Sequence, residues 1–498
     1  MKEYMEELYE NMGFTSNPFS RFSAEEEKEY LEDIYIKPRY YRTVYNDIKD
    51  GASRFIIGER GIGKTALMLN LEQDLEKNNV FSVLIDEYDG IPNVDNKKQL
   101  LLLIMRKIVT KYAVYLLNNR SVVRKLDKSD REKIAFYIDN FFETLSQDEY
   151  ERTKSTVTKY RQKRIFAQFF NFFLLKPINS IFSGASEWIS TTVTKSLGLP
   201  SVSDSFYKSY IPEISVTENQ QKIEVDSLEY IRTKQLLKML IDCIVKSGFN
   251  SVVVFFDKID EYQNLGTNIQ SIADFIKGIA LDTGLLQTEK CAFVFVVWSK
   301  VRDELNSQGV RYDKFKPIDV TWSDDELKNI LNRRLGFFSD NKVDMFSLLE
   351  NDHTDELLEL ANKSPRQLIV LMSRIYDEQE AENVQASVFS DAIVEKGIRQ
   401  FVCNFDFPSL YPGEKGKKSY IVNVVNSILK IGKHEFGSSD LVAQKKYSSQ
   451  AANNDIKIMK NYGLIEEKSE VSGHSKVYKV VDPIIRHMIN RTIEEMSI

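Results

Sequence analysis

Residues 58–65 have the residue types and the spacing of a loop that binds phosphate. They read GERGIGKT and match the pattern G-x-x-x-x-G-K-[ST] at every fixed position. Glycines let main-chain N–H groups approach phosphate oxygens that a Cβ atom would obstruct, and the lysine and threonine supply a positive charge and a ligand for Mg²⁺. A plain glycine-rich turn is the alternative. The pattern predicts that ATP and Mg²⁺ contact Gly58, Glu59, Arg60, Gly61, Ile62, Gly63, Lys64, Thr65 and Ala66.

The residues around this loop have the pattern of the elements that would position it. Residues 54–57 form a short apolar run that predicts a buried strand entering the loop, and residues 65–76 predict a helix leaving it. The N-terminal end of such a helix carries a partial positive charge directed at the same anion. This context favours a nucleotide site over a simple turn.

A second candidate group lies at 257–261, after the apolar run 251–256. A strand over that run would place Asp257 at its carboxyl end, where a carboxylate binds Mg²⁺ together with Thr65. Glu261 is placed to orient or deprotonate an attacking water. We therefore predict Lys64, Asp260 and Glu261 as catalytic residues, and Thr65 and Asp257 as metal ligands.

The composition is that of an ordinary globular protein. The 498 residues include 67 Lys and Arg against 73 Asp and Glu, so no global positive charge indicates a nucleic-acid partner. Three cysteines, far apart and odd in number, favour a reducing cytoplasm over a disulfide framework. We expect no signal peptide, because the start of the chain is acidic and lacks an apolar core. The apolar run 165–175 is too short to span a bilayer, which leaves a buried helix, an oligomer contact or a membrane-surface role.

The order of expected elements predicts an α/β fold. Strands are expected at 54–57, 80–86, 251–256, 291–298 and 317–322, separated by helices, as in a parallel sheet. Between Lys64 and Asp257 lie 192 residues, far more than a bare core needs. We expect an N-terminal segment (1–50), a P-loop NTPase core (51–322) with a large helical insertion (93–246), a helical lid (323–410) and a C-terminal winged helix-turn-helix (413–498).

The insertion itself is predicted to be helical at 97–119, 130–145, 150–175 and 228–247, with a Ser/Thr-rich stretch at 179–220 that has little regular pattern. The aromatic segment 38–42 precedes the phosphate loop, where it would either pack on the adenine ring or cover the sheet.

The C-terminal segment differs in charge from the rest of the chain. Residues 413–498 contain 12 Lys and 2 Arg against 10 acidic residues, and Lys457 and Lys460 lie along the predicted recognition helix. Contacts with DNA phosphates fit this charge, but few arginines are present to read bases. Binding of double-stranded DNA and packing against the ATPase core both stay open for this domain.

Together these motifs resemble the AAA+ and STAND branch of P-loop ATPases. The D-x-x-D-E arrangement of Asp257, Asp260 and Glu261 is similar to the Walker B box of NACHT-type NTPases. In that box a small residue usually follows the first Asp, whereas this chain has Lys258, and the origin-recognition type has a Glu at the same place. The resemblance implies ATP binding more firmly than hydrolysis.

The resemblance also implies roles for residues farther along the chain. Ser299 occupies the sensor-1 position, and Arg366 in Lys-Ser-Pro-Arg resembles the sensor-2 arginine that opens a lid helix. Arg302 and Arg311 lie where many AAA+ proteins present an arginine finger to a neighbouring subunit, and residues 333–335 resemble an Arg-Leu helix of the family. Surface ion pairs are the alternative for these arginines.

The implied function is a cytoplasmic ATPase whose nucleotide state drives a conformational switch or an assembly step. The segment Asn17-Pro18-Phe19 is similar to that of prokaryotic P-loop ATPases encoded near defence genes, which suggests an anti-phage role. We expect a homo-oligomer with a separate protein partner and no membrane span. The alternatives are a DNA-binding initiator or loader and a nucleotide-gated interaction scaffold with little hydrolysis.

Overall fold

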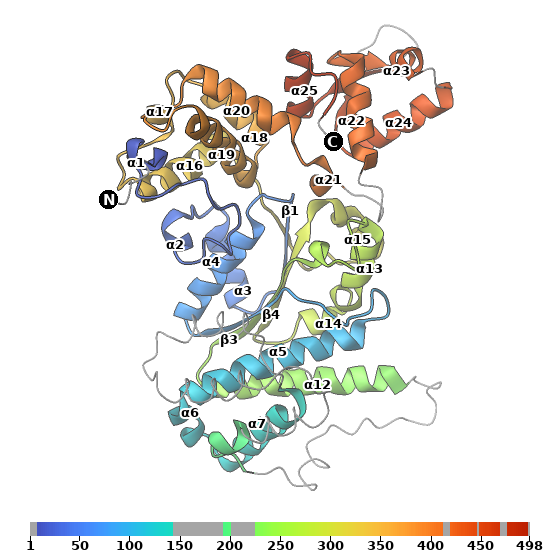
Figure 1. Ribbon diagram of the computed structural model, residues 1–498. Coiled ribbons are helices and arrows are strands. Elements are labelled where there is room, and N and C mark those ends of the chain that lie inside the picture. Colours follow the sequence, from blue (N-terminus) through green and yellow to red (C-terminus); the bar gives the residue numbers. More distant parts are fainter. Residues whose placement is uncertain are drawn as a thin grey trace, which may run out of the picture.

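The computed structural model describes residues 7–142, 193–200, 225–411, 419–445, 448–468 and 476–496 (Figure 1). The predicted helix at 150–175, the apolar run at 165–175 and all but residues 193–200 of the Ser/Thr-rich stretch lie outside the described residues. In the part that is described, every helix is too short or too polar to cross a lipid bilayer.

Five parallel strands form the central sheet, in the spatial order β2-β3-β4-β1-β5. Each strand predicted from the sequence is present, although the last one ends at Asp319 rather than at position 322. Strand β4 lies between β1, which leads into the phosphate loop, and β3, which ends next to Asp257. The chain therefore has the predicted α/β fold of a P-loop NTPase. The strands are β1 (Arg54–Gly58), β2 (Val80–Ile85), β3 (Ser251–Phe256), β4 (Cys291–Trp298) and β5 (Pro317–Asp319).

Helices cover both faces of this sheet, because the side chains of each buried strand alternate between two apolar layers. One layer contains Ile56 and Val253 and packs against α3 (Tyr41–Lys49) and α4 (Lys64–Lys77). The other contains Phe55 and packs against helices that come from the insertion and from the segment after β3. That segment and the one after β4 form η1 (Ile259–Glu261), α13 (Ile269–Ala280), α14 (Thr283–Leu286), η2 (Ser299–Val301) and α15 (Arg302–Ser307).

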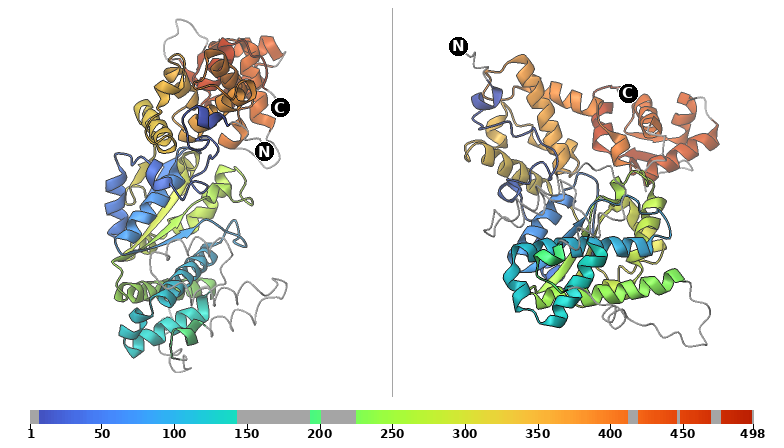
Figure 2. Two further views of the ribbon diagram at one scale, coloured as in Figure 1. Left: turned by 60° about the vertical axis from the view of Figure 1, so that its left-hand side comes forward. Right: turned by 60° about the horizontal axis from the view of Figure 1, so that its bottom comes forward.

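The insertion is helical where it is described. Its two long helices lie side by side below the sheet, and the views in Figures 1 and 2 agree on this arrangement. The predicted helices at 97–119 and 228–247 are confirmed within a few residues. The elements are α5 (Lys97–Asn118), α6 (Arg120–Lys125), α7 (Lys128–Phe141) and α12 (Val225–Lys246).

The N-terminal segment and the helices after β5 pack together at the opposite end of the molecule (Figure 2). The main-chain N–H of Thr15 donates to the carbonyl of Phe338, and α2 packs on α16. Helix α16 begins with a capping box in which Ser323 and Glu326 satisfy each other's main-chain N–H groups. The elements are α1 (Leu8–Asn11), α2 (Leu31–Ile34), α16 (Asp324–Phe338), α17 (Met345–Leu348), α18 (Thr354–Ala361), α19 (Pro365–Glu382), α20 (Asp391–Cys403) and α21 (Phe407–Leu410).

The C-terminal elements follow the predicted order of three helices and a hairpin. A short strand between the first two helices adds a third member to an antiparallel sheet of order β6-β8-β7, which the sequence did not indicate. Within the described residues of α24, an exposed face contains Lys457 and Lys460. The elements are α22 (Ser419–Ile431), β6 (Glu435–Gly437), α23 (Ser438–Lys445), α24 (Ser449–Asn461), β7 (Ile465–Glu467), β8 (Val477–Val480) and α25 (Pro483–Asn490).

Candidate functional site

The phosphate loop connects β1 to α4 through two glycines in the left-handed region. Gly61 has φ +78° and Gly63, the N-cap of α4, has φ +91°. Side chains other than glycine rarely adopt these angles, so the loop conformation depends on both residues. The first turn of α4 therefore leaves its N–H groups at the loop, as an anion site requires.

The two predicted metal ligands meet at the carboxyl end of the sheet. The Thr65 hydroxyl donates a hydrogen bond of 2.9 Å to Oδ2 of Asp257, which directly follows β3. A hydroxyl and a carboxylate beside a phosphate loop are the hard oxygen donors that Mg²⁺ prefers, so these residues fit that ion. The Lys64 ammonium folds back on the loop, where it donates to the carbonyls of Gly58 and Glu59 at 2.9 Å each.

Burial changes the protonation of these groups. Loss of water raises the pKa of Asp257 to about 6, and the hydrogen bond from Thr65 only partly offsets that rise. Loss of water also lowers the pKa of Lys64, although the nearby carboxylates of Asp260 and Asp257 act in the opposite direction. Burial therefore destabilises the charged forms of Asp257 and Lys64. A bound metal ion would stabilise the Asp257 carboxylate, and a bound polyphosphate would stabilise the Lys64 ammonium.

These groups line a pocket of about 140 Å³ with a polar and an apolar side. The polar side comes from the phosphate loop, Asp257, Asp260 and Glu261. The apolar side comes from the N-terminal segment and from the start of α19, through Phe22, Ala24, Leu31, Pro365 and Ile369. Such a lining suits a ligand with a charged and a flat apolar part, as a nucleotide has. The volume is below the roughly 300–1,000 Å³ typical of small-molecule sites, so binding of a whole nucleotide requires the pocket to open.

Two ion pairs hold the N-terminal segment over this pocket. Lys258, which has a left-handed backbone conformation, lies 2.8 Å from Oε1 of Glu25. Arg334 on α16 is buried, lies 2.5 Å from Oε1 of Glu27 and donates to the carbonyls of Pro18 and Arg21. Burial alone would raise the pKa of Glu25, but its hydrogen bonds, above all from Lys258, lower the pKa instead.

The start of α19 touches the phosphate loop. The Ser364 hydroxyl, at the N-cap, donates to the carbonyl of Gly61 at 3.1 Å. Pro365 occupies the first turn, as the Ser-Pro-Arg motif predicts. Arg366 is exposed, lines the pocket and donates from Nε to the carbonyl of Phe22 at 3.2 Å. The phosphate loop, the N-terminal segment and the start of α19 thus line one pocket.

The Arg60 side chain links the phosphate loop to three other parts of the chain. Its guanidinium donates to Oδ2 of Asp260 at 2.8 Å and to the carbonyl of Ser409 at 2.7 Å, and lies 4.5 Å above the Trp298 ring. The carboxylate of Asp260, predicted as catalytic, is thus engaged by an arginine. Glu261 is exposed at the pocket.

The remaining predicted residues lie outside the residues that line the pocket. Ser299 follows β4, and its buried hydroxyl has no hydrogen-bond partner among the residues that the structure describes. An unpartnered buried hydroxyl at the end of the neighbouring strand is the kind of group that a bound phosphate or water would satisfy. Arg302 lies 2.7 Å from Asp319, and Arg311 makes a bidentate pair with Asp313 at 2.8 and 2.7 Å.

Sequence reasoning missed the apolar wall of the pocket. The aromatic segment at 38–42 does not line it, since the Tyr41 hydroxyl donates to Asp74 on α4 instead. Phe22 and Leu31 reach the pocket from an N-terminal segment that carries no local sign of this contact. Ile369 had a usable signal, because it lies one helical turn after Pro365.

No protein-family model and no curated protein matches this sequence. Among solved structures, the chain is similar to the ORC2 protein of Aeropyrum pernix, with 10% identity, a TM-score of 0.42 and 97% of each chain covered. It is also similar to the Walker-type ATPase PABY2304 of Pyrococcus abyssi, with 13% identity, a TM-score of 0.40, and 92% of this chain and 97% of that chain covered. Likenesses this distant assign no activity to this chain.

Proposed function

We propose that this protein binds MgATP and hydrolyses it, and that its nucleotide state drives a conformational switch or an assembly step. The observation that carries the proposal is the hydrogen bond from the Thr65 hydroxyl to the Asp257 carboxylate at the phosphate loop. It brings together two residues that lie far apart in the sequence and whose oxygens suit Mg²⁺, beside backbone N–H groups that suit phosphate.

The residues divide the chemistry among them in this proposal. Lys64 leaves the loop carbonyls and binds the β- and γ-phosphates, while Thr65 and Asp257 hold the metal ion. Bound Mg²⁺ neutralises charge on the phosphates. Glu261 orients or deprotonates the attacking water, and Asp260 positions Arg60.

The state of the site is reported to other parts of the chain by two residues. Arg366 senses the nucleotide from the lid, where it lines the pocket, and Ser299 senses it from the residue after β4. The proposed units are an N-terminal segment (1–50), a core (51–322) with its insertion (93–246), a lid (323–410) and a winged helix (413–498). A homo-oligomer in which Arg302 or Arg311 reaches the next subunit would require its present ion pair to open. A cytoplasmic location, a separate protein partner and a role in anti-phage defence complete the proposal.

A DNA-binding initiator or loader is the second candidate. It is favoured by the exposed face of α24, which contains Lys457, and by the excess of lysine in this domain. Lys460 on the same face is engaged by Glu467 at 2.8 Å, which lowers the charge available to DNA. A nucleotide-gated scaffold is the third, because Lys258 departs from the usual Walker B pattern.

ATP turnover with and without duplex DNA separates these functions. We expect turnover by the intact protein and its loss in Lys64→Ala and Glu261→Gln, because the first removes a phosphate ligand and the second removes the base. Stimulation by DNA would favour the loader. Glu289→Gln, which changes an exposed glutamate elsewhere, is the matched control and should leave turnover unchanged.

Binding of ATP without turnover, in the presence or absence of DNA, would support the scaffold and contradict the role given to Glu261. Absence of ATP binding by the intact protein would contradict the proposed function as a whole.

A further inference from the structure

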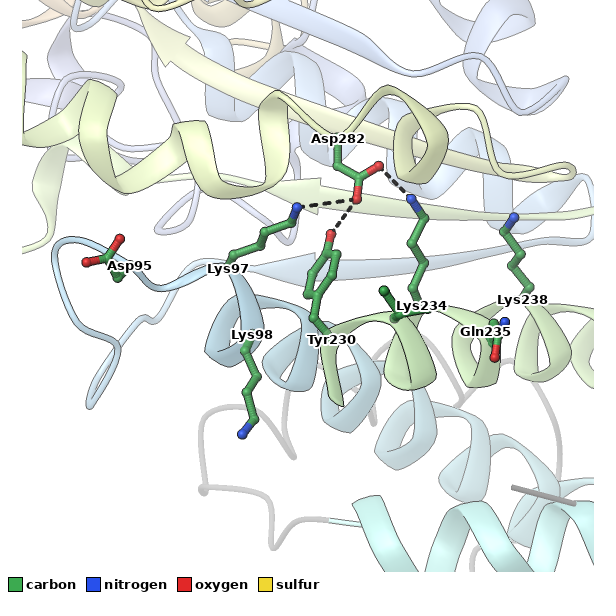
Figure 3. Close-up of a pocket in the computed structure, with 9 residues that line it drawn as sticks. Asp95, Lys97, Lys98, Tyr230, Lys234, Gln235, Lys238 and Asp282 are labelled. Carbon is green, nitrogen blue, oxygen red and sulfur yellow. Dashed lines mark hydrogen bonds and ion pairs between the residues drawn. The ribbon is translucent and has the colours of Figure 1, made fainter. Parts of the chain in front are cut away.

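A second, larger pocket lies between the insertion and the segment after β3, and Figure 3 shows the residues that line it. Its volume is about 590 Å³, and no residue lines both pockets. It is formed by the start of α5, one face of α12 and the residue before α14. The lining residues are Asp95, Lys97, Lys98, Tyr230, Ile231, Lys234, Gln235, Lys238 and Asp282.

The lining of this pocket is basic, since it has four lysines against two aspartates. In Figure 3, Lys97, Lys234 and Lys238 extend toward the same side of the pocket, whereas Lys98 points away from them. Lys98 is paired with Glu229. Three ammonium groups from two helices therefore lie along the same side of the pocket.

Asp282 does not neutralise these three groups. It accepts hydrogen bonds from Lys234 at 2.5 Å, from the Tyr230 hydroxyl at 2.7 Å and from the main-chain N–H of Leu285 at 2.9 Å, so it is the N-cap of α14 as well. Burial opposes its ionisation, but these hydrogen bonds lower its pKa and keep it charged. The Asp282 carboxylate thus fixes the side chains of Lys234 and Tyr230, which form one wall of the pocket.

Two lysines keep charge available for a ligand. Lys97 is 3.8 Å from Asp282, its side chain is 48% exposed, and its ammonium lies 4.2 Å from the centre of the Tyr230 ring. Lys238 is exposed and has no ion-pair partner among the residues that the structure describes. Lys97 is also the first residue of α5, where helix N–H groups add a partial positive charge.

We propose that this pocket binds a small anion that carries two or more phosphate groups. Its volume lies within the range of about 300–1,000 Å³ typical of small-molecule sites. Each lysine ammonium is a compact point charge, and those in this pocket come from two helices and occupy separate positions. They therefore suit a ligand with several phosphate groups better than a ligand with a single phosphate. The site shares no lining residue with the proposed ATP site, so it adds a second binding site to the proposed ATPase.

The test uses inorganic tripolyphosphate as the probe, measured by titration calorimetry on the full chain. The Lys64→Ala variant serves as the starting protein, so that binding at the phosphate loop does not obscure the second site. We expect one binding site in this variant. The affinity should fall by at least about tenfold when Lys97→Gln and Lys238→Gln are added, because each substitution removes a charged donor to the phosphates.

Lys128→Gln is the matched control, because Lys128 lies in the same insertion with a side chain that is 82% exposed. It should leave the affinity unchanged. Absence of binding to Lys64→Ala, or equal binding after loss of Lys97 and Lys238, would overturn the proposal. A parallel titration with a short single-stranded DNA tests whether the phosphates that bind here belong to a nucleic acid rather than to a small anion. Binding of that DNA through the two lysines without binding of tripolyphosphate would overturn the small-anion site in favour of nucleic acid.

Discussion

At the scale of single residues, Asp257 is the group whose chemistry depends most on its surroundings. It is buried behind the Thr65 hydroxyl, and its pKa of about 6 lies well above the ordinary 3.8. Mg²⁺ binds the ionised carboxylate, so protonation of Asp257 competes with the metal ion.

We therefore predict that affinity for MgATP falls as the pH falls below about 6, by up to about tenfold per unit. Titration with a fluorescent ATP analogue between pH 5 and 8 would measure this. Asp257→Asn should bind MgATP weakly and without this pH dependence, whereas Asp325→Asn, at an exposed position on α16, should behave like the intact protein. An affinity that does not change between pH 7 and 5 would contradict the assignment.

The same raised pKa of Asp257 makes the metal-free protein more stable as the pH falls, whereas its affinity for MgATP decreases. Between the ordinary pKa of 3.8 and about 6, the folded protein binds a proton that the unfolded chain releases. This contribution to the free energy of unfolding is present below that window and is lost as the pH rises through it. Thermal unfolding without Mg²⁺ would measure it as the difference between the intact protein and Asp257→Asn.

At the scale of elements, the N-terminal segment is part of the nucleotide site rather than an appendage. Phe22 and Leu31 line the pocket, and the buried pair of Glu27 and Arg334 attaches this segment to α16. Their side chains are only 8% and 3% exposed. Removal of one partner leaves a charge buried without compensation, which typically costs about 3–5 kcal/mol.

We predict that Arg334→Ala releases the N-terminal segment from the lid and weakens nucleotide binding, because the apolar wall of the pocket is then lost. Hydrogen exchange of residues 17–34 should become faster, and the fluorescent ATP titration should show weaker binding. The control is Asn329→Ala, at an exposed position on the same helix. Equal effects of the two substitutions would argue against the buried pair as the attachment.

The parts of the fold and of the site that depend on local sequence patterns were predictable, whereas contacts between residues far apart in the sequence were not. The strands were predictable because each is a continuous apolar run, and the start of α19 was predictable because Ser364 and Pro365 are local signals of a helix N-terminus. The pairing of Glu25 with Lys258 and the wall formed by Phe22 have no local signal. Strand β6 is three residues long and exists only through its pairing with β8, so no periodicity could indicate it.

At the scale of the whole molecule, Arg60 connects the phosphate loop with the segment that leads to the C-terminal domain. It donates to the carbonyl of Ser409 in α21. Tyr411, the residue that caps the end of this helix, donates from its hydroxyl to Asp482 at the start of α25. Helix α25 in turn contacts the lid, where Arg486 lies 3.2 Å from Glu359. A change in the loop on nucleotide binding therefore has a continuous route to this domain.

This connection predicts that Arg60→Ala separates nucleotide binding from the state of the C-terminal domain. In the intact protein, MgATP should change hydrogen exchange in residues 407–411, because the loop that holds Arg60 closes on phosphate. In the variant, exchange in this segment should be faster without nucleotide and should no longer respond to it. Arg39→Ala, at a side chain that is 91% exposed, is the matched control. If the variant retained the response of the intact protein, the route would not pass through Arg60, and the contacts of α25 with the lid would have to carry the coupling.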